Sequence, residues 1–453
     1  MTMKLENGNR VCIAGGGPAG SFSAIHLLRL AGKKKIDLEV IIFESRAAHM
    51  EPGAKSCKGC AGILSSELVK GMKKIGIEIP EDVILERLNS YKIHTRTEVI
   101  HIDQPESDRE ILSVFRGKGP CKITGREQNS FDQFLRDTAV KRGARLITDK
   151  ITLIDREEKP VIVTENEKYP CDFLVLATGV NSHVNISESY SYTPPKTLSM
   201  VQQEVKRPAN WSGSTVAAYF DKPDGYLFGA LVPKDEYLSI SLLGKTKMDR
   251  TAINSFLKEP KCGLENFFPE EPENLCHCCP KINYKPARVY YGNRWVAVGD
   301  AAVTRLYKDG IGSSFRTAKR AMSTAVHCGI SHSTFEKSYK PFCNEIASDN
   351  RFGHFLIRMF LFLLKNRRLG RICTGCLILE CQMNKDQRIY SKILWGMITG
   401  DYSYKQLFMM MVSIRGLTRF ILNVIRIIGR TKSIPIAYYW DKYYVRKFRN
   451  SRY

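Results

Sequence analysis

Three glycines at G-x-G-x-x-G spacing, directly after a short apolar run, limit most strongly what this chain can fold into. Residues 10–28 read RVCIAGGGPAGSFSAIHLL, in which Val11–Ala14 have the character of a buried parallel strand. The tight turn that follows requires Gly15, a pyrophosphate approaching the backbone requires Gly17, and a helix packing on the strand requires Gly20. The pattern predicts a dinucleotide-binding βαβ unit at the start of the chain.

The residues around the glycines agree with this interpretation. Pro18 suits the first turn of a helix, because its missing N–H would have no partner there, and Ala19 continues the turn that faces the phosphates. The next apolar run, Leu38–Phe43, ends in Glu44. A carboxylate at the end of that strand can accept both ribose hydroxyls of an adenosine, although it lies a little further along than usual. The adenosine diphosphate site is therefore expected at Gly15, Gly17, Pro18, Ala19, Gly20 and Glu44.

A second element indicates FAD rather than a nicotinamide nucleotide. Trp295–Val298 has the pattern of a strand and runs into Gly299 and Asp300, and Gly310-Ile311-Gly312 opens a helix after a loop. This order is typical of flavoproteins of the glutathione-reductase superfamily, in which the Asp accepts a hydrogen bond from the ribityl chain. Amides at the helix start face the flavin pyrimidine ring, and the helix dipole stabilises the negative charge of reduced flavin.

Together these motifs resemble the geranylgeranyl reductase family, within the p-hydroxybenzoate hydroxylase-like group of FAD enzymes. The resemblance covers most of the chain: GGGPAG (15–20), SFDQFLRDTAVKRGARLI (130–147), FLVLATGVNSHV (173–184), GYLFGALVPK (225–234), GDAA (299–302) with GIG (310–312), and LWGMITGDYSYKQL (394–407). The sequence departs from the family pattern at Thr178, where an Asp is usual, at Tyr307, where a Pro is common, and at Phe228 or Gly229, where a Trp is expected. The expected arginine before the Phe-Asp pair is displaced, and Arg126 is the nearest one.

The resemblance implies an α/β fold in which a Rossmann-type FAD-binding domain carries an inserted antiparallel-sheet substrate domain and a helical C-terminal region. Alternating apolar residues between 190 and 290 favour such a sheet. The boundaries expected are 1–110 and 111–185 for the first two parts of the FAD domain, 186–290 for the substrate domain, 291–350 for the third part of the FAD domain, and 351–453 for the basic helical region.

Cys57 and Cys60 form a C-x-x-C motif after the second strand, where the resemblance implies a cysteine near the flavin. Cys57 and Cys60 are the candidate catalytic residues. A thiol here could shape the substrate pocket or donate a proton to a reduced alkene carbon. The pair could also exchange electrons with the flavin as a disulfide, or form half of a metal site. The alternative is a turn in which both side chains are merely packed.

The remaining cysteines, of fourteen in all, are expected to be free thiols in a reducing compartment, because the N-terminal residues carry no export signal. The dense group Cys276, Cys278 and Cys279 has no second ligand pair at finger-like spacing. A metal site shared with Cys373 and Cys376 is conceivable, but buried packing is the more common role for such thiols. No metal is therefore assigned.

The C-terminal region is basic and amphipathic. In 407–428 and just beyond, Arg415, Arg419, Arg426 and Arg430 fall within an arc of roughly 60° on a helix, and most other residues are aliphatic. Arginines in mid-bilayer would each cost roughly 2.5–3.5 kcal/mol, so an interfacial helix on an anionic membrane is favoured over a spanning one. The alternative is a core helix whose arginines reach solvent. The net charge of +23 indicates an anionic partner, which is a membrane, a phosphorylated substrate or nucleic acid, unless it is simply a solvated basic surface; no nucleic-acid module is evident.

The function expected from the sequence is FAD-dependent reduction of double bonds in an isoprenoid or other hydrophobic lipid. NAD(P)H or another donor would reduce the flavin, and the protein would be cytoplasmic and peripheral on the inner face of the membrane. Two alternatives stay open: an FAD-dependent monooxygenase of a small hydrophobic molecule, and a membrane-bound flavoprotein exchanging electrons through Cys57 and Cys60. A shared fold does not decide among them.

Overall fold

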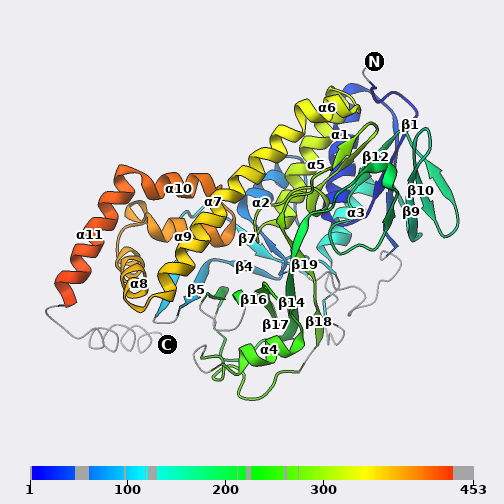
Figure 1. The fold of residues 1–453 in the computed structure, drawn as a ribbon. Helices are drawn as coiled ribbons and strands as arrows, with labels where there is room; N and C mark the ends of the chain where they lie inside the picture. Colours follow the sequence, from blue (N-terminus) through cyan, green and yellow to red (C-terminus); the bar gives the residue numbers. More distant parts are fainter. Residues whose placement is uncertain are drawn as a thin grey trace.

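The computed structural model describes residues 3–45, 61–95, 98–117, 119–120, 130–211, 213–220, 226–259, 263–273 and 275–431. Cys57, Cys60 and Arg126, which the sequence analysis singled out, lie outside these ranges. Within them the chain forms four sheets and a helical C-terminal layer (Figure 1).

A six-stranded sheet lies at the centre of the N-terminal part of the fold. Its order is β20-β21-β12-β1-β2-β8, and every neighbouring pair is parallel except β20 and β21. The strands are β1 (Asn9–Ala14), β2 (Leu38–Phe43), β8 (Arg145–Ile147), β12 (Phe173–Leu176), β20 (Tyr291–Gly292) and β21 (Trp295–Ala297). Segments 162 residues apart in the chain, β1 and β12, are thus neighbours, and the strands expected from apolar runs near 11, 38 and 295 are confirmed.

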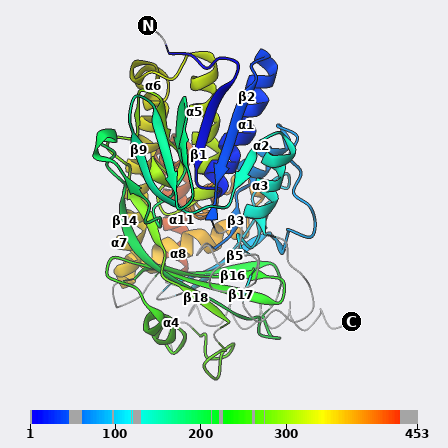
Figure 2. The ribbon, with the colours of Figure 1, turned by 90° about the vertical axis from the view of Figure 1, so that its right-hand side faces the viewer.

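Three helices pack close to this sheet: α1 (Pro18–Lys34), α3 (Phe131–Lys141) and α5 (Gly310–His327). Helices α1 and α5 lie side by side, with Phe22 edge-on to Phe315 at 5.1 Å between ring centroids. Helix α6 (His332–Ser338) and the first part of α7 (Lys340–Lys365) extend the same layer (Figures 1 and 2). Both helix starts that the glycine motifs predict are therefore present, next to each other at one end of the sheet.

Two smaller sheets flank the six-stranded one. The first contains β9 (Ile151–Arg156), β10 (Pro160–Thr164), β11 (Lys168–Pro170) and β13 (Asn185–Ile186). The second contains β3 (Ile63–Leu64), β4 (Glu86–Leu88) and β7 (Ile111–Ser113), with α2 (Ser66–Lys73) packed beside it. The second sheet follows the C-x-x-C segment in sequence and leads the chain toward the largest sheet.

The largest sheet has eight strands in the order β18-β14-β17-β16-β15-β5-β6, and β19 also pairs with β14. The strands are β5 (Ser90–His94), β6 (Val99–Asp103), β14 (Lys196–Lys206), β15 (Thr215–Tyr219), β16 (Tyr226–Lys234), β17 (Tyr237–Gly244), β18 (Cys276–Cys278) and β19 (Lys281–Lys285). The alternating segments between 190 and 290 do form antiparallel strands. However, β5 and β6 come from residues that the sequence analysis grouped with the nucleotide-binding part, and β5 pairs parallel to β15, so the sheet is mixed.

Both faces of this sheet are covered. Helix α4 (Arg250–Leu257) packs on one face, where Phe256 meets Tyr219 edge-on at 5.2 Å. The C-terminal helices cover the other face, where Trp395 meets Tyr91 edge-on at 5.3 Å within a buried apolar cluster. The sheet therefore joins the C-terminal region to the rest of the molecule through a shared core.

The C-terminal layer contains α7 and four shorter helices: α8 (Arg367–Cys381), α9 (Tyr390–Thr399), α10 (Tyr404–Val412) and α11 (Ile414–Thr431). In Figure 1, α10 and α11 lie at the end of the molecule farthest from the six-stranded sheet. The amphipathic pattern over 407–428 divides between α10 and α11, which meet at 62°. The break falls at Ser413, whose hydroxyl accepts the Gly416 N–H at 3.0 Å and starts the new helix.

Among the described helices, none is by itself long and apolar enough to cross a membrane. The bent pair Tyr404–Val412 and Ile414–Gly429 meets the requirement of length and composition only when both halves are taken together.

Candidate functional site

The first glycine of the fingerprint forms the tight turn at the end of β1. Gly15 has φ of +109°, a backbone conformation that side chains with a Cβ rarely adopt, and a Cβ there would lie 2.5 Å from the Ala177 carbonyl oxygen. A Cβ on Gly20 would overlap the Gly15 carbonyl, so α1 can approach the strand only with glycine at that position. Pro18 and Ala19 form the first turn of α1, as expected.

Gly17 is different, because nothing in the described chain crowds it. A Cβ there would have only Arg116 Nη2 at 3.6 Å and Asp132 Oδ2 at 4.0 Å as close neighbours, and its φ is −73°. Glycine at such a position leaves room for something outside the chain to approach the backbone at the N-terminus of α1. This is the place at which the fingerprint puts a pyrophosphate.

Arg116 is a site residue that sequence reasoning missed. Its guanidinium binds the Asp132 carboxylate through Nε and Nη2, at 3.0 and 2.9 Å, and Asp132 is fully buried at the start of α3. The paired geometry fixes the guanidinium beside Gly17, where a positive charge suits a pyrophosphate. The sequence did contain a signal, the Phe-Asp pair of the motif, whose Asp132 is the residue that binds Arg116. The pair does not identify the arginine, however, because Arg116 lies 16 residues earlier in a different segment.

Glu44 follows β2 and reaches back to the glycine turn. Its Oε2 accepts the Gly16 N–H at 3.2 Å, and Arg136 on α3 donates to the Gly16 carbonyl at 3.3 Å. The acid that the sequence assigned to the adenosine ribose therefore lies beside the fingerprint, within the same small region as Gly17 and Arg116.

The second motif places its residues at the other helix start. Gly299 and Asp300 follow β21 in a short 3-10 turn, and Gly299 contacts α1 at Ala19 and α5 at Ser314. Burial raises the pKa of Asp300, while the positive charge of Arg116 acts in the opposite direction. Apart from its chain neighbours and the backbone of its own helix, the described atom within 4 Å of a Cβ built on Gly310 is Asp300 Oδ1, at 3.6 Å. Gly310, like Gly17, thus borders open space beside an acidic group.

The start of α5 carries a feature that the sequence did not suggest. The carboxylate of Asp309 lies over Gly312, where a Cβ would overlap it, and Ile311 beside it is buried. Asp309 also accepts hydrogen bonds from Ser65 at 3.0 Å and Arg316 at 3.1 Å. Burial raises the pKa of this carboxyl group, and these partners oppose the shift.

The loop from Val303 to Asp309 is held by the C-terminal helices. Asn350 on α7 accepts the Leu306 N–H and donates to the Thr304 carbonyl, both at 2.8 Å. Tyr404 donates to the Leu306 carbonyl at 2.9 Å, and the Arg305 guanidinium stacks over its ring at 4.0 Å. The C-terminal region is therefore part of the structure that positions the second motif.

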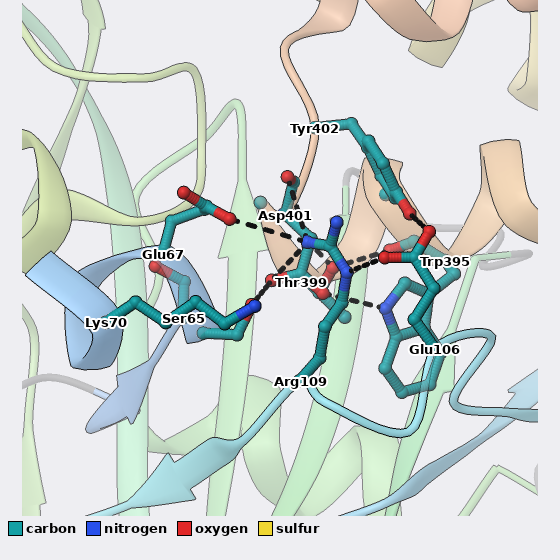
Figure 3. A network of polar contacts seen from close by, with 12 residues as sticks. Ser65, Glu67, Lys70, Glu106, Arg109, Trp395, Thr399, Asp401 and Tyr402 are labelled. Atoms are coloured by element: carbon teal, nitrogen blue, oxygen red, sulfur yellow. Dashed lines mark hydrogen bonds and ion pairs between the residues drawn. The ribbon is translucent and has the colours of Figure 1, made fainter.

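The segment 399–402 makes a second set of contacts between the C-terminal region and the rest of the protein (Figure 3). Asp401 accepts hydrogen bonds from Ser66 at 2.7 Å and from Trp395 at 2.9 Å, and lies 3.9 Å from Arg109. Arg109 lies over the ring of Tyr402 at 4.5 Å. The resemblance had singled out this stretch of sequence, and the structure shows it binding α2 and the loop before β7.

An apolar pocket lies beside the loop that precedes α5. It is enclosed by β15 and β16, by the loop, and by α7 and α9. Its lining residues are Phe220, Leu227, Phe228, Tyr307, Lys308, Ile357, Leu394, Met397 and Ile398. The pocket thus adjoins the start of α5, and its walls come from the large sheet and the C-terminal layer together.

Within the described ranges, the thiols of Cys12, Cys171, Cys279, Cys328, Cys343, Cys373, Cys376 and Cys381 are free. Cys276 on β18 is buried, Cys278 is half-buried and Cys279 is exposed. Within the same ranges, no group of three or more His, Cys, Asp or Glu side chains is arranged to hold a metal ion.

Comparison with known proteins identifies what this arrangement serves. Residues 9–257 match the FAD binding domain family, a match that spans both small sheets and most of the large one. The chain belongs to this family. Its members are flavin-dependent enzymes of oxidoreductase and monooxygenase type, and FAD is the cofactor of this protein.

Alignments with individual relatives cover more of the chain than the family match does. An uncharacterized protein of Methanosarcina barkeri is 27% identical over 342 residues, covering 71% of this chain and 76% of its own length. The geranylgeranyl diphosphate reductase of Synechocystis is 23% identical over 354 residues, covering 70% and 75%. A geranylgeranyl bacteriochlorophyll reductase-like structure from Thermoplasma acidophilum has a TM-score of 0.63 at 15% identity, covering 89% of this chain and all of its own. Flavin-dependent halogenases share the fold as well.

The residues present fit FAD. Gly17 and Gly310, the uncrowded glycines of the two motifs, lie at the starts of α1 and α5, one beside Arg116 and the other beside Asp300. Arg116 and Glu44 can hold the adenosine diphosphate half, and Asp300 with the amides of α5 can hold the ribityl and ring half.

Proposed function

We propose that this FAD enzyme reduces carbon–carbon double bonds in a hydrophobic chain, an isoprenoid or another lipid. The observation that carries the proposal is the apolar pocket beside the start of α5, whose lining is almost entirely aliphatic and aromatic. A pocket of this kind favours an apolar chain over a polar metabolite. The names of the Synechocystis relative and of the Thermoplasma acidophilum structure, both of which refer to reductases of geranylgeranyl compounds, support the same class of substrate.

When bound, FAD supplies the two-electron chemistry of such a reduction. The protein then has three tasks: to hold the cofactor, to bind the chain, and to supply a proton while excluding water. The glycine turn, Arg116 and Asp300 serve the first, and the aromatic walls at Phe220 and Phe228 serve the second. For the third, the loop that lines the pocket at Tyr307 and Lys308 is held in place by Asn350 on α7, which accepts the Leu306 N–H.

We further propose that α11 attaches the protein peripherally to the anionic inner face of the membrane. Its residues Ile414, Leu417, Ile421, Ile425 and Ile428 recur every three or four positions and are exposed, Ile414 at 85% and Ile425 at 60%. Gly416 and Asn423, on the opposite side of the helix, are buried. The apolar stripe therefore points away from the body of the protein, and Arg415 and its neighbours flank it, as in helices that lie in a membrane interface.

The function is tested by anaerobic single turnover. Holoenzyme is reduced with dithionite and mixed with geranylgeraniol in detergent. We expect the flavin to be reoxidised, seen as the return of its absorbance at about 450 nm. The product should be heavier than the substrate by two hydrogens. The fully saturated alcohol is the matched control and should leave the flavin reduced.

Other outcomes of this experiment would point elsewhere. Flavin that stays reduced with every polyene, but reoxidises with oxygen and yields a hydroxylated product in the presence of NAD(P)H, would contradict the reductase and favour the monooxygenase. If NAD(P)H reduces the flavin of the wild type only slowly, and the flavin of Cys57→Ser is no longer reduced, electron entry through the C-x-x-C motif would be favoured.

A further inference from the structure

The apolar pocket contains one ammonium group whose role the fold does not explain. Lys308 Nζ lies 4.4 Å from the centroid of the Phe228 ring, and the other lining residues except Tyr307 carry no ionisable group. Among the described residues, no carboxylate lies within ion-pair distance of it. A positive charge in such surroundings is costly unless the site uses it.

The backbone around Lys308 is also unusual. Tyr307 and Asp309 both have positive φ, at 59° and 54°, a region that residues with a Cβ adopt only at a cost in conformational energy. The loop is held in this shape by the Asn350 contacts to Leu306 on one side and by Ser65 and Arg316 bound to Asp309 on the other. The chain therefore accepts strain on both sides of Lys308, and the result is that the lysine side chain lines the pocket.

We propose that Lys308 is the catalytic acid that delivers a proton from Nζ to the substrate chain in the pocket. The inference rests on the proposed function and deepens it, since it names the proton donor that the sequence analysis sought at Cys60. Lys308 lies two residues before Gly310, so the donor and the start of α5 share one short loop.

The step balances as follows. Saturating one double bond adds a hydride to one carbon and a proton to the other. The hydride, with its electron pair, comes from the reduced flavin, and the proton comes from the Lys308 ammonium. The N–H bond breaks as the second C–H bond forms, the nitrogen keeps its electron pair as a neutral amine, and water returns the proton afterwards. Lysine itself is neither oxidised nor reduced.

Burial lowers the pKa of Lys308 to about 8, and no charged group contributes to the shift. The ionisable groups around this corner are Tyr307 and Asp309 in the loop, His354 and Arg358 on α7, and Tyr284 on β19. Burial raises the pKa of Tyr307 and lowers that of His354. At neutral pH Lys308 thus stays mostly protonated, yet gives up its proton far more readily than an exposed lysine.

The activity test compares Lys308→Met with Lys308→Arg in the anaerobic single turnover with geranylgeraniol. Both variants should slow flavin reoxidation by at least 100-fold, on the scale typical of general acid catalysis. Arginine keeps the positive charge but does not release a proton. The Lys308→Arg variant therefore distinguishes a lysine that donates a proton from one that only binds a negatively charged group. Flavin content and the Kd of the saturated alcohol should change less than about twofold. Lys285→Met, at the exposed last position of β19, is the matched control and should react like the wild type.

A second readout does not depend on turnover. Lysines of the holoenzyme are methylated with ¹³C-formaldehyde, and the Lys308 signal is assigned by its absence in Lys308→Arg. It should titrate near pH 8 and shift when the saturated alcohol is added. The wild-type turnover rate should fall as pH rises through about 8, because the ammonium is then lost.

Three results would overturn the inference: full activity in Lys308→Met, rescue by arginine, or a Lys308 signal that titrates with the exposed lysines. Each is distinguishable from failure of the proposed function, in which the wild-type holoenzyme itself leaves every polyene unreduced.

Discussion

Ser66 Oγ donates a 2.7 Å hydrogen bond to Asp401 Oδ1 across 335 residues of sequence. The preceding residue, Ser65, donates in the same way to Asp309 at 3.0 Å. Two adjacent serines at the start of α2 therefore bind the C-terminal region and the start of α5. The loop from Val303 to Asp309, α2 and the C-terminal helices are thus linked by these hydrogen bonds, and Figure 3 shows the part of the network around Asp401.

Replacing Asp401 with asparagine tests this connection. The carboxylate is fully buried and accepts from both Ser66 and Trp395, and an amide can accept from only one side. Hydrogen bonds to a charged acceptor are worth roughly 1.5–3 kcal/mol, so we expect Asp401→Asn to lose about 2 kcal/mol in the free energy of unfolding. Urea denaturation gives the value. The exposed Asp386→Asn should stay within about 0.5 kcal/mol of the wild type; equal losses in the two variants would argue against the connection.

Glu106 should make stability depend on pH in the acid range. Burial by itself would raise the pKa of this carboxyl group, but hydrogen bonds from Lys392, Tyr402 and Arg109 lower it to about 2. A depressed folded-state pKa contributes stability that is present above about pH 4.5 and is lost as the pH falls toward 2. Because the side chain is about one-third exposed, we expect a contribution on the order of 1 kcal/mol.

The measurement is the free energy of unfolding of wild type and Glu106→Gln at several pH values from 6 down to 2 (a range of about two units on either side of the ordinary carboxyl pKa). The gap between the two proteins should narrow steadily below about pH 4.5. A gap that stays constant with pH would mean that the carboxylate charge contributes nothing to stability.

The parts of the site that sequence could predict are those whose signal is local. Gly15, Gly17 and Gly20 lie within one turn and mark the end of β1, and Gly310 marks the start of α5 in the same way. Few residue types are acceptable in a tight turn or at such a helix start, so the pattern predicts these features without knowledge of the fold. The strands of the large sheet could be predicted because the alternation of apolar residues is also a local pattern.

The parts that sequence could not predict depend on contacts between distant segments. Arg116 is fixed by Asp132 on a different element, and the loop that carries Lys308 into the pocket wall is held at Leu306 by Asn350 on α7. The division of the 407–428 pattern at Ser413 likewise depends on one side-chain hydrogen bond. Periodicity continues across such a break, since apolar spacing is similar on both sides, and so it does not reveal the bend.

Gly17→Ala should separate cofactor binding from folding. A methyl group there would meet its nearest described neighbour at 3.6 Å, and the backbone has ordinary φ, so we expect unfolding to change by less than about 0.5 kcal/mol. The same methyl occupies the space through which a pyrophosphate approaches, so FAD affinity should fall at least tenfold. Fluorescence titration of the apoprotein with FAD measures this.

Gly32→Ala is the matched control for that experiment. Gly32 lies near the end of α1, and nothing in the described chain is within 4 Å of a Cβ built there. Alanine is the better helix former by up to about 1 kcal/mol, so stability should rise while FAD affinity stays the same. Unchanged FAD affinity in Gly17→Ala would remove Gly17 from the cofactor site.

The exposed stripe of α11 should decide membrane attachment. Ile421 and Ile425 lie one turn apart on it, and each buried isoleucine side chain contributes roughly 1.5–3 kcal/mol. The double variant Ile421→Glu/Ile425→Glu should therefore reduce binding to phosphatidylglycerol-containing vesicles at least tenfold in a sedimentation assay. Val140→Glu, at an exposed position on α3, is the matched control and should bind like the wild type.

Charge should contribute separately from the apolar stripe. Arg415 and Arg426 flank the stripe, and a basic residue near an anionic surface is worth about 1 kcal/mol. Arg415→Gln/Arg426→Gln should thus weaken binding to anionic vesicles about tenfold or more, while binding to neutral phosphatidylcholine vesicles changes little. If the isoleucine variant and the wild type sediment equally with anionic vesicles, α11 does not attach this protein to membranes, and its apolar face must be covered by something else.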